Sequence, residues 1–299
     1  MKLYSNTPAE YFEESPAKEG FNLKEFLLKY TKYWPYIFLS VILALSAAYV
    51  KNQFTAPTYK TESKFLIKEN DNSLDILDLT GLVGKGVGKQ AQKLANESIL
   101  MKSKPLAEQV LGHLDFDVEY YTEGPFIKTE IYNARPVTVT LDWDHTQLTD
   151  GFLKLSWAND QSFQVELVDD EYFLAVPGQV RKEKVENPKF KNASFAFGDW
   201  VESDLFKFKV NSPAPSGAGE IFLKFRDLKS LVAQYAGDNF QVFTVDETAS
   251  ILSLSLICNQ PEKGQLYLNT LMEVYLDNEL KDKTLIASNT VDFIDSQIS

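Results

Sequence analysis

The sequence contains a single cysteine and only two histidines among its 299 residues. One cysteine cannot form a disulfide within the chain, and two histidines leave little material for a zinc site or a histidine-based catalytic triad. Cys258 ends an apolar run that begins at Ile251, which predicts a buried and unreactive thiol. We therefore expect no catalytic site, no metal site and no cofactor in these residues.

Positive charge is scarce as well. Lysine and arginine together number 30 against 42 aspartates and glutamates, which gives a formal net charge of −12. The first 33 residues carry five lysines and five glutamates, so the excess negative charge lies later in the chain. Binding of nucleic acid needs clustered lysine and arginine, so we expect no nucleic-acid partner. An alternative interpretation is that the acidic surface simply keeps the folded domain soluble.

Charge is absent altogether from residues 34–50, which read WPYIFLSVILALSAAYV. As a helix this segment would span roughly 25 Å, slightly less than a hydrocarbon core of about 30 Å. Lys32 and Lys51 can extend toward water, and Tyr33 and Tyr49 suit the interfaces. We therefore predict a transmembrane helix. Its expected anchor residues are Trp34, Pro35, Ile37, Phe38, Leu39, Val41, Ile42, Leu43, Leu45 and Val50.

Two other interpretations of this segment stay open. A cleaved signal peptide would need a shorter preceding tail, although Ser46, Ala47 and Ala48 imitate a cleavage site. A buried soluble helix is more typical of runs of 10 to 14 residues. Lysines are equally numerous on both sides of the segment, so only the short N-terminal tail favours a cytoplasmic N-terminus.

Three features imitate ligand sites without meeting their requirements. The glycine-rich residues 81–90 lack the G-x-x-x-x-G-K-[ST] spacing of a phosphate loop, and Gln90 stands where serine or threonine is needed. The acidic and histidine clusters at residues 113–117 and 142–145 have no further ligands at useful spacing. Tryptophans 143, 157 and 200 could stack on sugars, but packing is the commoner role in a β-rich region.

The segments before residue 135 mix helix and strand patterns. Residues 1–20 lack apolar periodicity and are expected to be disordered, and a short interfacial helix should begin at Asn22. Alternating residues 59–67 predict a strand with one wet face, followed by a flexible loop at 71–89. We expect helices to begin at Asn96-Glu97 and again at Ser103-Lys104-Pro105, and to end near Gly112.

The later segments change character. Short alternating stretches separated by turn formers predict a β-sandwich in residues 135–225. A helix capped by Asp227 and closed by Gly237 follows, with strands at 240–245 and 251–258. From Pro261 onward the sequence predicts one helix longer than 25 residues, which is typical of a coiled-coil-like arm.

These patterns define an α+β protein with a single N-terminal transmembrane helix, an α/β domain with an inserted β-sandwich-like segment, and a long C-terminal helix. The expected division is a cytoplasmic tail with an interfacial helix (1–33), the transmembrane helix (34–50), the first part of the α/β domain (51–134), the β-rich insertion (135–225), the second part of the α/β domain (226–260) and the start of the long helix (261–299).

The order of these elements, with several short motifs, resembles the Wzz-type polysaccharide chain-length determinants, also called polysaccharide co-polymerases. The presence of a β-rich insertion indicates the larger subclass of this family, which resembles the Wzc-type tyrosine autokinases. The motif residues are Pro57, Tyr59, Asn96, Glu97, Leu100, Ser103, Pro105, the LSLS-type strand at 251–256, Phe293, Ile294 and Gln297.

The resemblance implies a bacterial inner-membrane protein with most of its residues in the periplasm. It would act in capsule, exopolysaccharide or O-antigen biosynthesis and export as an oligomeric scaffold rather than as an enzyme. Implied partners are further copies of the chain, a polysaccharide polymerase, the outer-membrane export machinery, the lipid bilayer and the polysaccharide itself. In the kinase subclass a second membrane helix and a kinase domain follow, so we expect these residues to be the N-terminal portion of a longer protein.

Two alternatives remain. The residues could be the sensor region of a membrane tyrosine autokinase, which a second apolar run and a phosphate loop in the following coding sequence would establish. They could also belong to a secretion-system adaptor, although in such adaptors the helical hairpin lies inside a β-domain, whereas here the β-rich block precedes the long helix.

Overall fold

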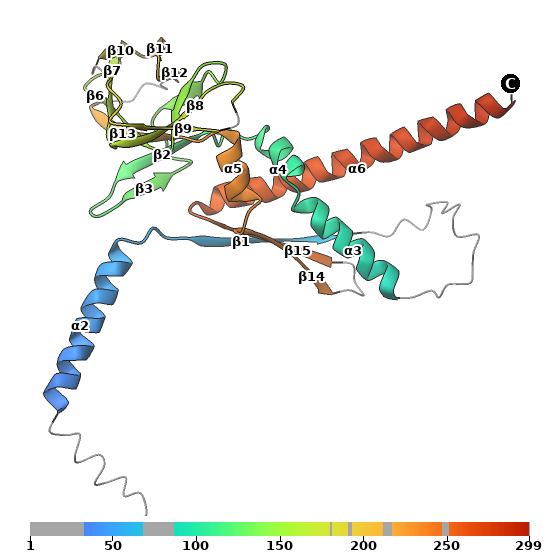
Figure 1. Cartoon of the computed structure of the whole chain (residues 1–299), viewed down its shortest axis with the longest axis horizontal. Helices are drawn as coiled ribbons and strands as arrows, with labels where there is room; N and C mark the ends of the chain where they lie inside the picture. The colour runs from blue at the N-terminus through green and yellow to red at the C-terminus, as the bar shows by residue number, and fades with distance from the viewer. Residues whose placement is uncertain are drawn as a thin grey trace, which may run out of the picture. The chain divides into compact units, whose positions relative to one another are not determined.

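The computed structural model describes residues 33–67, 87–179, 181–190, 193–211, 217–246 and 251–298 (Figure 1). The chain divides into two compact units, residues 1–55 and 56–299. The predictions for residues 1–20, for a helix from Asn22 and for most of the loop at 71–89 lie outside the described residues.

The first unit contains helix α2 (Trp34–Gln53). It has 20 residues, so it is about 30 Å long and three residues longer than the uncharged run. Lys51 and the amides after it extend the helix, and this removes the deficit in length expected from the sequence. None of its side chains is buried, and the helix is long and apolar enough to cross a membrane.

A three-stranded antiparallel sheet organises the first hydrophobic core of the second unit. Its order is β1 (Tyr59–Leu66), β15 (Ile251–Cys258) and β14 (Phe240–Asp246). The alternation predicted for β1 is confirmed, because Thr61, Ser63 and Phe65 are partly buried and the residues between them are exposed. In β15, Leu252, Leu254 and Leu256 point into the core, and Cys258 is buried as predicted.

Four helices contribute to this core, namely α3 (Val87–Met101), α4 (Lys104–Leu111), α5 (Leu228–Tyr235) and the long α6 (Pro261–Ile298). Helix α6 packs on β1 and β15, α3 packs on β14, and α4 packs between α5 and α6 (Figure 1). Ser103 caps α4 by accepting a hydrogen bond from the Leu106 N–H, and Gly112 is its C-cap, both as predicted. Asp227 is the N-cap of α5 but makes no capping bond, and Ala236, not Gly237, ends the helix.

The prediction that a helix begins at Asn96-Glu97 is wrong. Helix α3 begins at Val87, nine residues earlier, so this pair lies in its interior and Val87–Lys89 are helical rather than part of a loop. Residues 87–95 contain good helix formers such as Lys, Gln, Ala and Leu, and the polar Asn-Glu pair only imitates a cap.

The second hydrophobic core belongs to the β-rich region inserted between α4 and α5. A six-stranded sheet has the order β10-β7-β6-β13-β2-β3, and two three-stranded sheets have the orders β11-β12-β4 and β5-β8-β9. The strands are β2 (Val118–Glu123), β3 (Lys128–Ile131), β4 (Thr138–Leu141), β5 (Gln147–Thr149), β6 (Phe152–Trp157), β7 (Ser162–Leu167), β8 (Glu171–Ala175), β9 (Glu183–Glu186), β10 (Ser194–Ala196), β11 (Trp200–Ser203), β12 (Phe206–Asn211) and β13 (Gly219–Phe225).

The β-rich region begins earlier than the sequence suggested. Strands β2 and β3 lie before residue 135, yet β2 pairs with β13 in the six-stranded sheet. The sheet topology therefore moves the start of this region to Val118.

Helix α6 has two different halves. Tyr267, Leu268, Leu271 and Tyr275 are buried in the first core, so this half is an ordinary packed helix rather than a free arm. Every described side chain from Leu280 to Gln297 is exposed. The prediction of one long helix is confirmed, and only its second half can serve as a coiled-coil-like arm.

Candidate functional site

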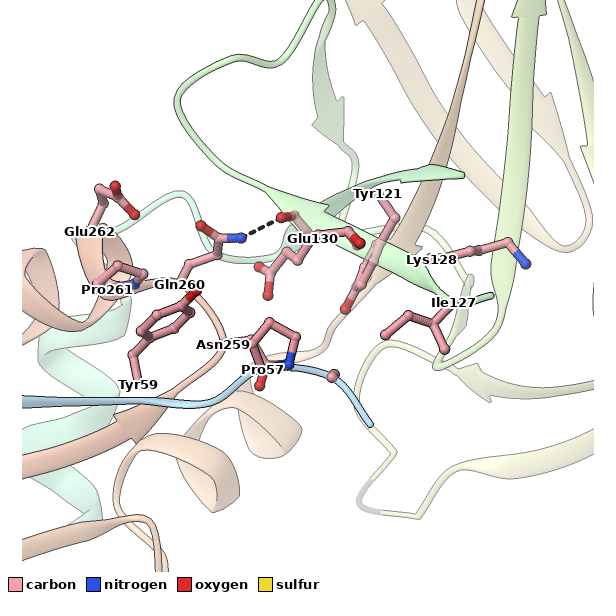
Figure 2. A pocket seen from close by; sticks show the side chains of 12 residues that line it. Pro57, Tyr59, Tyr121, Ile127, Lys128, Glu130, Asn259, Gln260, Pro261 and Glu262 are labelled. Atoms are coloured by element: carbon pink, nitrogen blue, oxygen red, sulfur yellow. Dashed lines mark hydrogen bonds between the residues drawn. The ribbon is translucent and has the colours of Figure 1, made fainter. Parts of the chain in front are cut away.

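Three distant parts of the chain meet around a pocket of about 260 Å³ in the second unit (Figure 2). The start of β1 contributes Pro57 and Tyr59, the β2–β3 hairpin contributes Tyr121 and residues 127–130, and the turn from β15 into α6 contributes residues 259–262. The pocket therefore lies at the junction between the two hydrophobic cores. Its first lining residue, Ala56, is three residues beyond the end of α2 in sequence.

A buried ion pair fixes one wall of this pocket. The Lys263 ammonium lies 2.6 Å from Glu130 Oε1, and both side chains are more than nine-tenths buried. The Gln260 side-chain amide donates to the Glu130 carbonyl oxygen (Figure 2), and the same ammonium lies over the rings of Phe116 and Tyr132. Burial raises the pKa of Glu130 above its ordinary value, and the attraction of Lys263 only partly offsets this.

A charge network between the β-rich region and α5 also joins the two cores. Asp150 accepts hydrogen bonds from Arg226 at 2.8 Å and from Lys182 at 2.6 Å. Arg226 also reaches Gln234 of α5, and Lys182 pairs with Asp227 at the start of that helix. Burial acts to raise the pKa of Asp227, but the bonds from Lys182 and Ser230 outweigh it and lower the pKa. The polar groups named here thus pair with one another and link the two cores.

The motif residues of the family resemblance are spread over the junction pocket, α3, the start of α4, strand β15 and the end of α6. Pro57 and Tyr59 line the junction pocket. Asn96 and Glu97 lie in α3, where the Glu97 carboxylate accepts a 2.6 Å hydrogen bond from the Tyr275 hydroxyl of α6. Burial raises the pKa of Tyr275, which keeps this hydroxyl a donor.

The remaining motif residues serve a helix cap and two exposed surfaces. Ser103 and Pro105 form the first turn of α4, and Leu100 is exposed on α3. Phe293, Ile294 and Gln297 lie near the exposed end of α6. These residues therefore stabilise helix ends and contacts between elements or remain uncovered, and they do not converge on one site.

Helix α2 presents the predicted anchor residues on its whole circumference. Among them, Trp34, Ile37, Phe38, Leu39 and Leu43 are half or more exposed. The rings of Trp34 and Phe38 stack with their centroids 5.7 Å apart. A helix that is apolar all around and buried nowhere fits a membrane-spanning segment rather than a core helix.

The exposed half of α6 carries an apolar seam that the sequence analysis missed. At about 100° per residue, Leu276, Leu280, Ala287, Val291 and Ile294 fall within a sector of about 60°. The buried residues of the first half of α6 lie on roughly the opposite side of the helix. The spacing of seven residues between Leu280, Ala287 and Ile294 is the signal that could have revealed this seam.

The other features noted in the sequence have structural surroundings. Trp143 donates its indole N–H to Asp117 at 3.0 Å, Trp157 is buried in the second core, and Trp200 is about half exposed. Burial raises the pKa of the Cys258 thiol, which accords with an unreactive side chain. Among the described residues, no group of three histidines, cysteines or carboxylates lies close enough to hold a metal ion.

Comparison with known proteins adds no family to these observations. No family model matches the sequence, and no curated protein is significantly similar to it. The chain is therefore defined by its structure, as a mixed α+β protein with an apolar N-terminal helix that is long enough to cross a membrane and a long C-terminal helix.

Proposed function

We propose that this protein is a membrane-anchored scaffold of the polysaccharide co-polymerase type, which acts in bacterial surface polysaccharide biosynthesis and export. Helix α2 anchors the chain in the inner membrane, and the second unit lies in the periplasm. Copies of the chain associate around the growing polymer and bias its length. The action needs no catalytic residue, because it depends on how the copies are arranged.

The observation that carries the proposal is that two helices each present an exposed apolar surface that packs against neither hydrophobic core. Helix α2 buries none of its side chains, and the seam of α6 faces away from the sheet on which this helix packs. An isolated helical stretch has little stability in water, so the second half of α6 needs a partner to stay ordered. A bilayer and a neighbouring copy are the partners that fit the two surfaces.

The test combines a gene deletion with variants of the seam. The deletion should change the length or the amount of surface polysaccharide on a gel, and wild-type protein should restore it. The double variant Leu280→Asp, Ile294→Asp should restore it poorly, because two carboxylates interrupt the seam. The matched control Ser288→Asp adds a charge on the polar side of the same helix, which carries Lys281 and Asp292, and should behave as wild type.

The same variants should also differ in the mass of the assembly that they form. Light scattering in detergent should give a multimeric mass for wild type and for Ser288→Asp, and a smaller mass for the seam variant. Unchanged polysaccharide in the deletion strain, or a monomeric wild-type protein in lipid, would overturn the proposal. Sequencing the coding region beyond Ser299 would tell whether a kinase domain follows.

A further inference from the structure

The exposed half of α6 carries a second apolar surface, on a different side from the seam. Ile286 and Phe293, here called the stripe, are 65% and 64% exposed. At about 100° per residue they lie about 115° from the centre of the seam. They follow the buried residues Leu268 and Tyr275 by about five full turns, so the stripe continues the core-facing side of the helix.

The stripe lies beyond the end of the first core. Tyr275 is the last buried side chain among the described residues of α6, and Phe293 lies about 27 Å farther along the helix axis. In Figure 1 this half of α6 runs clear of the sheet and of α3 and α4. A partner for the stripe must therefore come from outside the part of the chain that the structure describes.

The chemistry of this half of α6 suits contacts on more than one side. Residues 284–291 include no charged side chain, although all of them are exposed, whereas a helix surface that stays in water normally carries charge. The Thr284 hydroxyl donates to the Leu280 carbonyl at 2.9 Å, and the Thr290 hydroxyl donates to the Ile286 carbonyl at 2.8 Å. Both hydroxyls therefore keep a hydrogen-bond partner when a neighbouring helix displaces water.

We propose that the stripe of one copy packs against the seam of a second copy. The seam runs for about 27 Å from Leu276 to Ile294, which is long enough to cover a stripe of about 10 Å. Two copies joined seam to seam would leave both stripes in water, whereas contact between stripe and seam covers one surface of each kind.

This contact is heterologous, so each pair keeps one free seam and one free stripe to which further copies can add. The inference rests on the proposed scaffold function. It adds to that function a second interaction surface and the way in which neighbouring copies meet.

The experiment crosslinks full-length chains in detergent. Two differently tagged copies are produced together, one with a seam cysteine, Ala287→Cys or Val291→Cys, and the other with a stripe cysteine, Ile286→Cys or Phe293→Cys. A short bismaleimide joins cysteines that lie close together, and wild-type protein, whose only cysteine is buried, serves as the blank. The matched control replaces the stripe cysteine by Asp292→Cys, an exposed position on the polar side of the same helix.

We expect the yield of linked dimer to be several-fold higher for a seam cysteine with a stripe cysteine than for two seam cysteines, two stripe cysteines or the control pair. A chain that carries both Val291→Cys and Phe293→Cys should give a ladder of dimers, trimers and larger products. Preferential linkage of seam to seam would overturn the inference in favour of a two-fold pair. A seam-to-stripe yield no higher than that of the control would overturn it as well.

Light scattering on the same samples before crosslinking separates the two possible failures. A monomeric wild-type protein would refute the scaffold function itself. A multimeric wild-type protein without linkage between seam and stripe would refute only this contact. If Phe293→Cys alone dissociates the multimer while Asp292→Cys does not, the stripe takes part in assembly, and the crosslinking test then uses Ile286→Cys.

Discussion

Removal of the Lys263 side chain should destabilise the second unit more than any ordinary surface substitution. In wild type its ammonium lies 2.6 Å from Glu130 Oε1 and over the rings of Phe116 and Tyr132. Lys263→Met keeps most of the apolar stem but leaves the Glu130 carboxylate buried without its cation. Breaking a buried pair in this way typically costs about 3–5 kcal/mol.

The loss should be smaller when both charges are removed together. In the double variant Glu130→Gln, Lys263→Met no uncompensated charge remains, and such replacements are often close to neutral. A double-mutant cycle on residues 56–299 measures the coupling by urea unfolding, because both hydrophobic cores consist of residues from Phe65 onward. A cost below about 1 kcal/mol for Lys263→Met alone, or no recovery in the double variant, would refute this account of the junction.

The cost of Lys263→Met should also depend on pH. Burial already raises the pKa of Glu130, and loss of the lysine raises it further. A carboxyl whose folded pKa lies above its unfolded pKa is stabilising when protonated, so stability falls as pH rises from the unfolded pKa through the folded one. The variant should therefore be closer to wild type near pH 5 than at pH 7.5. A cost that is constant or larger at pH 5 would contradict the assignment.

Three further substitutions test other parts of the structure. Val41→Arg places a cation near the middle of α2, which costs about 3 kcal/mol of insertion free energy. The variant should therefore be released from membranes by alkaline extraction, whereas the control Val41→Leu should stay in the membrane. Gly264→Ala would place its Cβ 2.7 Å from both Cys258 Sγ and Thr61 Oγ1, so it should lower the free energy of unfolding in urea by about 1–3 kcal/mol. The control Gly112→Ala, at an open helix end, should not lower it. Equal effects of the two substitutions would refute the close packing of α6 on β1 and β15. The Tyr172 hydroxyl donates to the Phe152 carbonyl at 2.6 Å and accepts from the N–H groups of Val168 and Asp169. Tyr172→Phe should therefore lower the free energy of unfolding by about 1–3 kcal/mol. A neutral effect on thermal unfolding would show that water replaces the hydroxyl.

The elements that could be predicted are those whose sequence pattern matches their burial. Strand β15 places Leu252, Leu254 and Leu256 in the first core, as its alternation predicts, although Ser253 and Ser255 between them are buried as well. Strand β1 alternates between partly buried and exposed residues, and α6 packs on it. The start of α4 was predictable because a serine cap and a proline in the first turn act locally. Long helices α2 and α6 were predictable from the absence of charge in one and of helix breakers in the other.

The elements that were missed or misplaced owe their burial to partners far along the chain. Strands β2 and β3 carry Glu119 and Glu130, which look like solvent-facing residues but are buried beside Arg226 and Lys263. No local pattern reveals that such charges will be neutralised by residues more than a hundred positions away. The junction pocket was missed for the same reason, because its three walls come from segments that become neighbours only in the folded chain.

Substitutions in helix α6 can test folding and assembly separately, because the side that packs in the first core and the exposed seam lie on nearly opposite sides of the helix. The side that contains Tyr267 and Leu271 belongs to the first core, so substitutions there should lower the stability of an isolated chain. The side that contains Leu280 and Ile294 touches no core, so aspartate there should change the mass of the assembly and leave urea unfolding of residues 56–299 nearly unchanged. A seam variant that unfolds as easily as a core variant would mean that the second half of α6 packs against its own chain, and the argument for a neighbouring copy would then lose its basis.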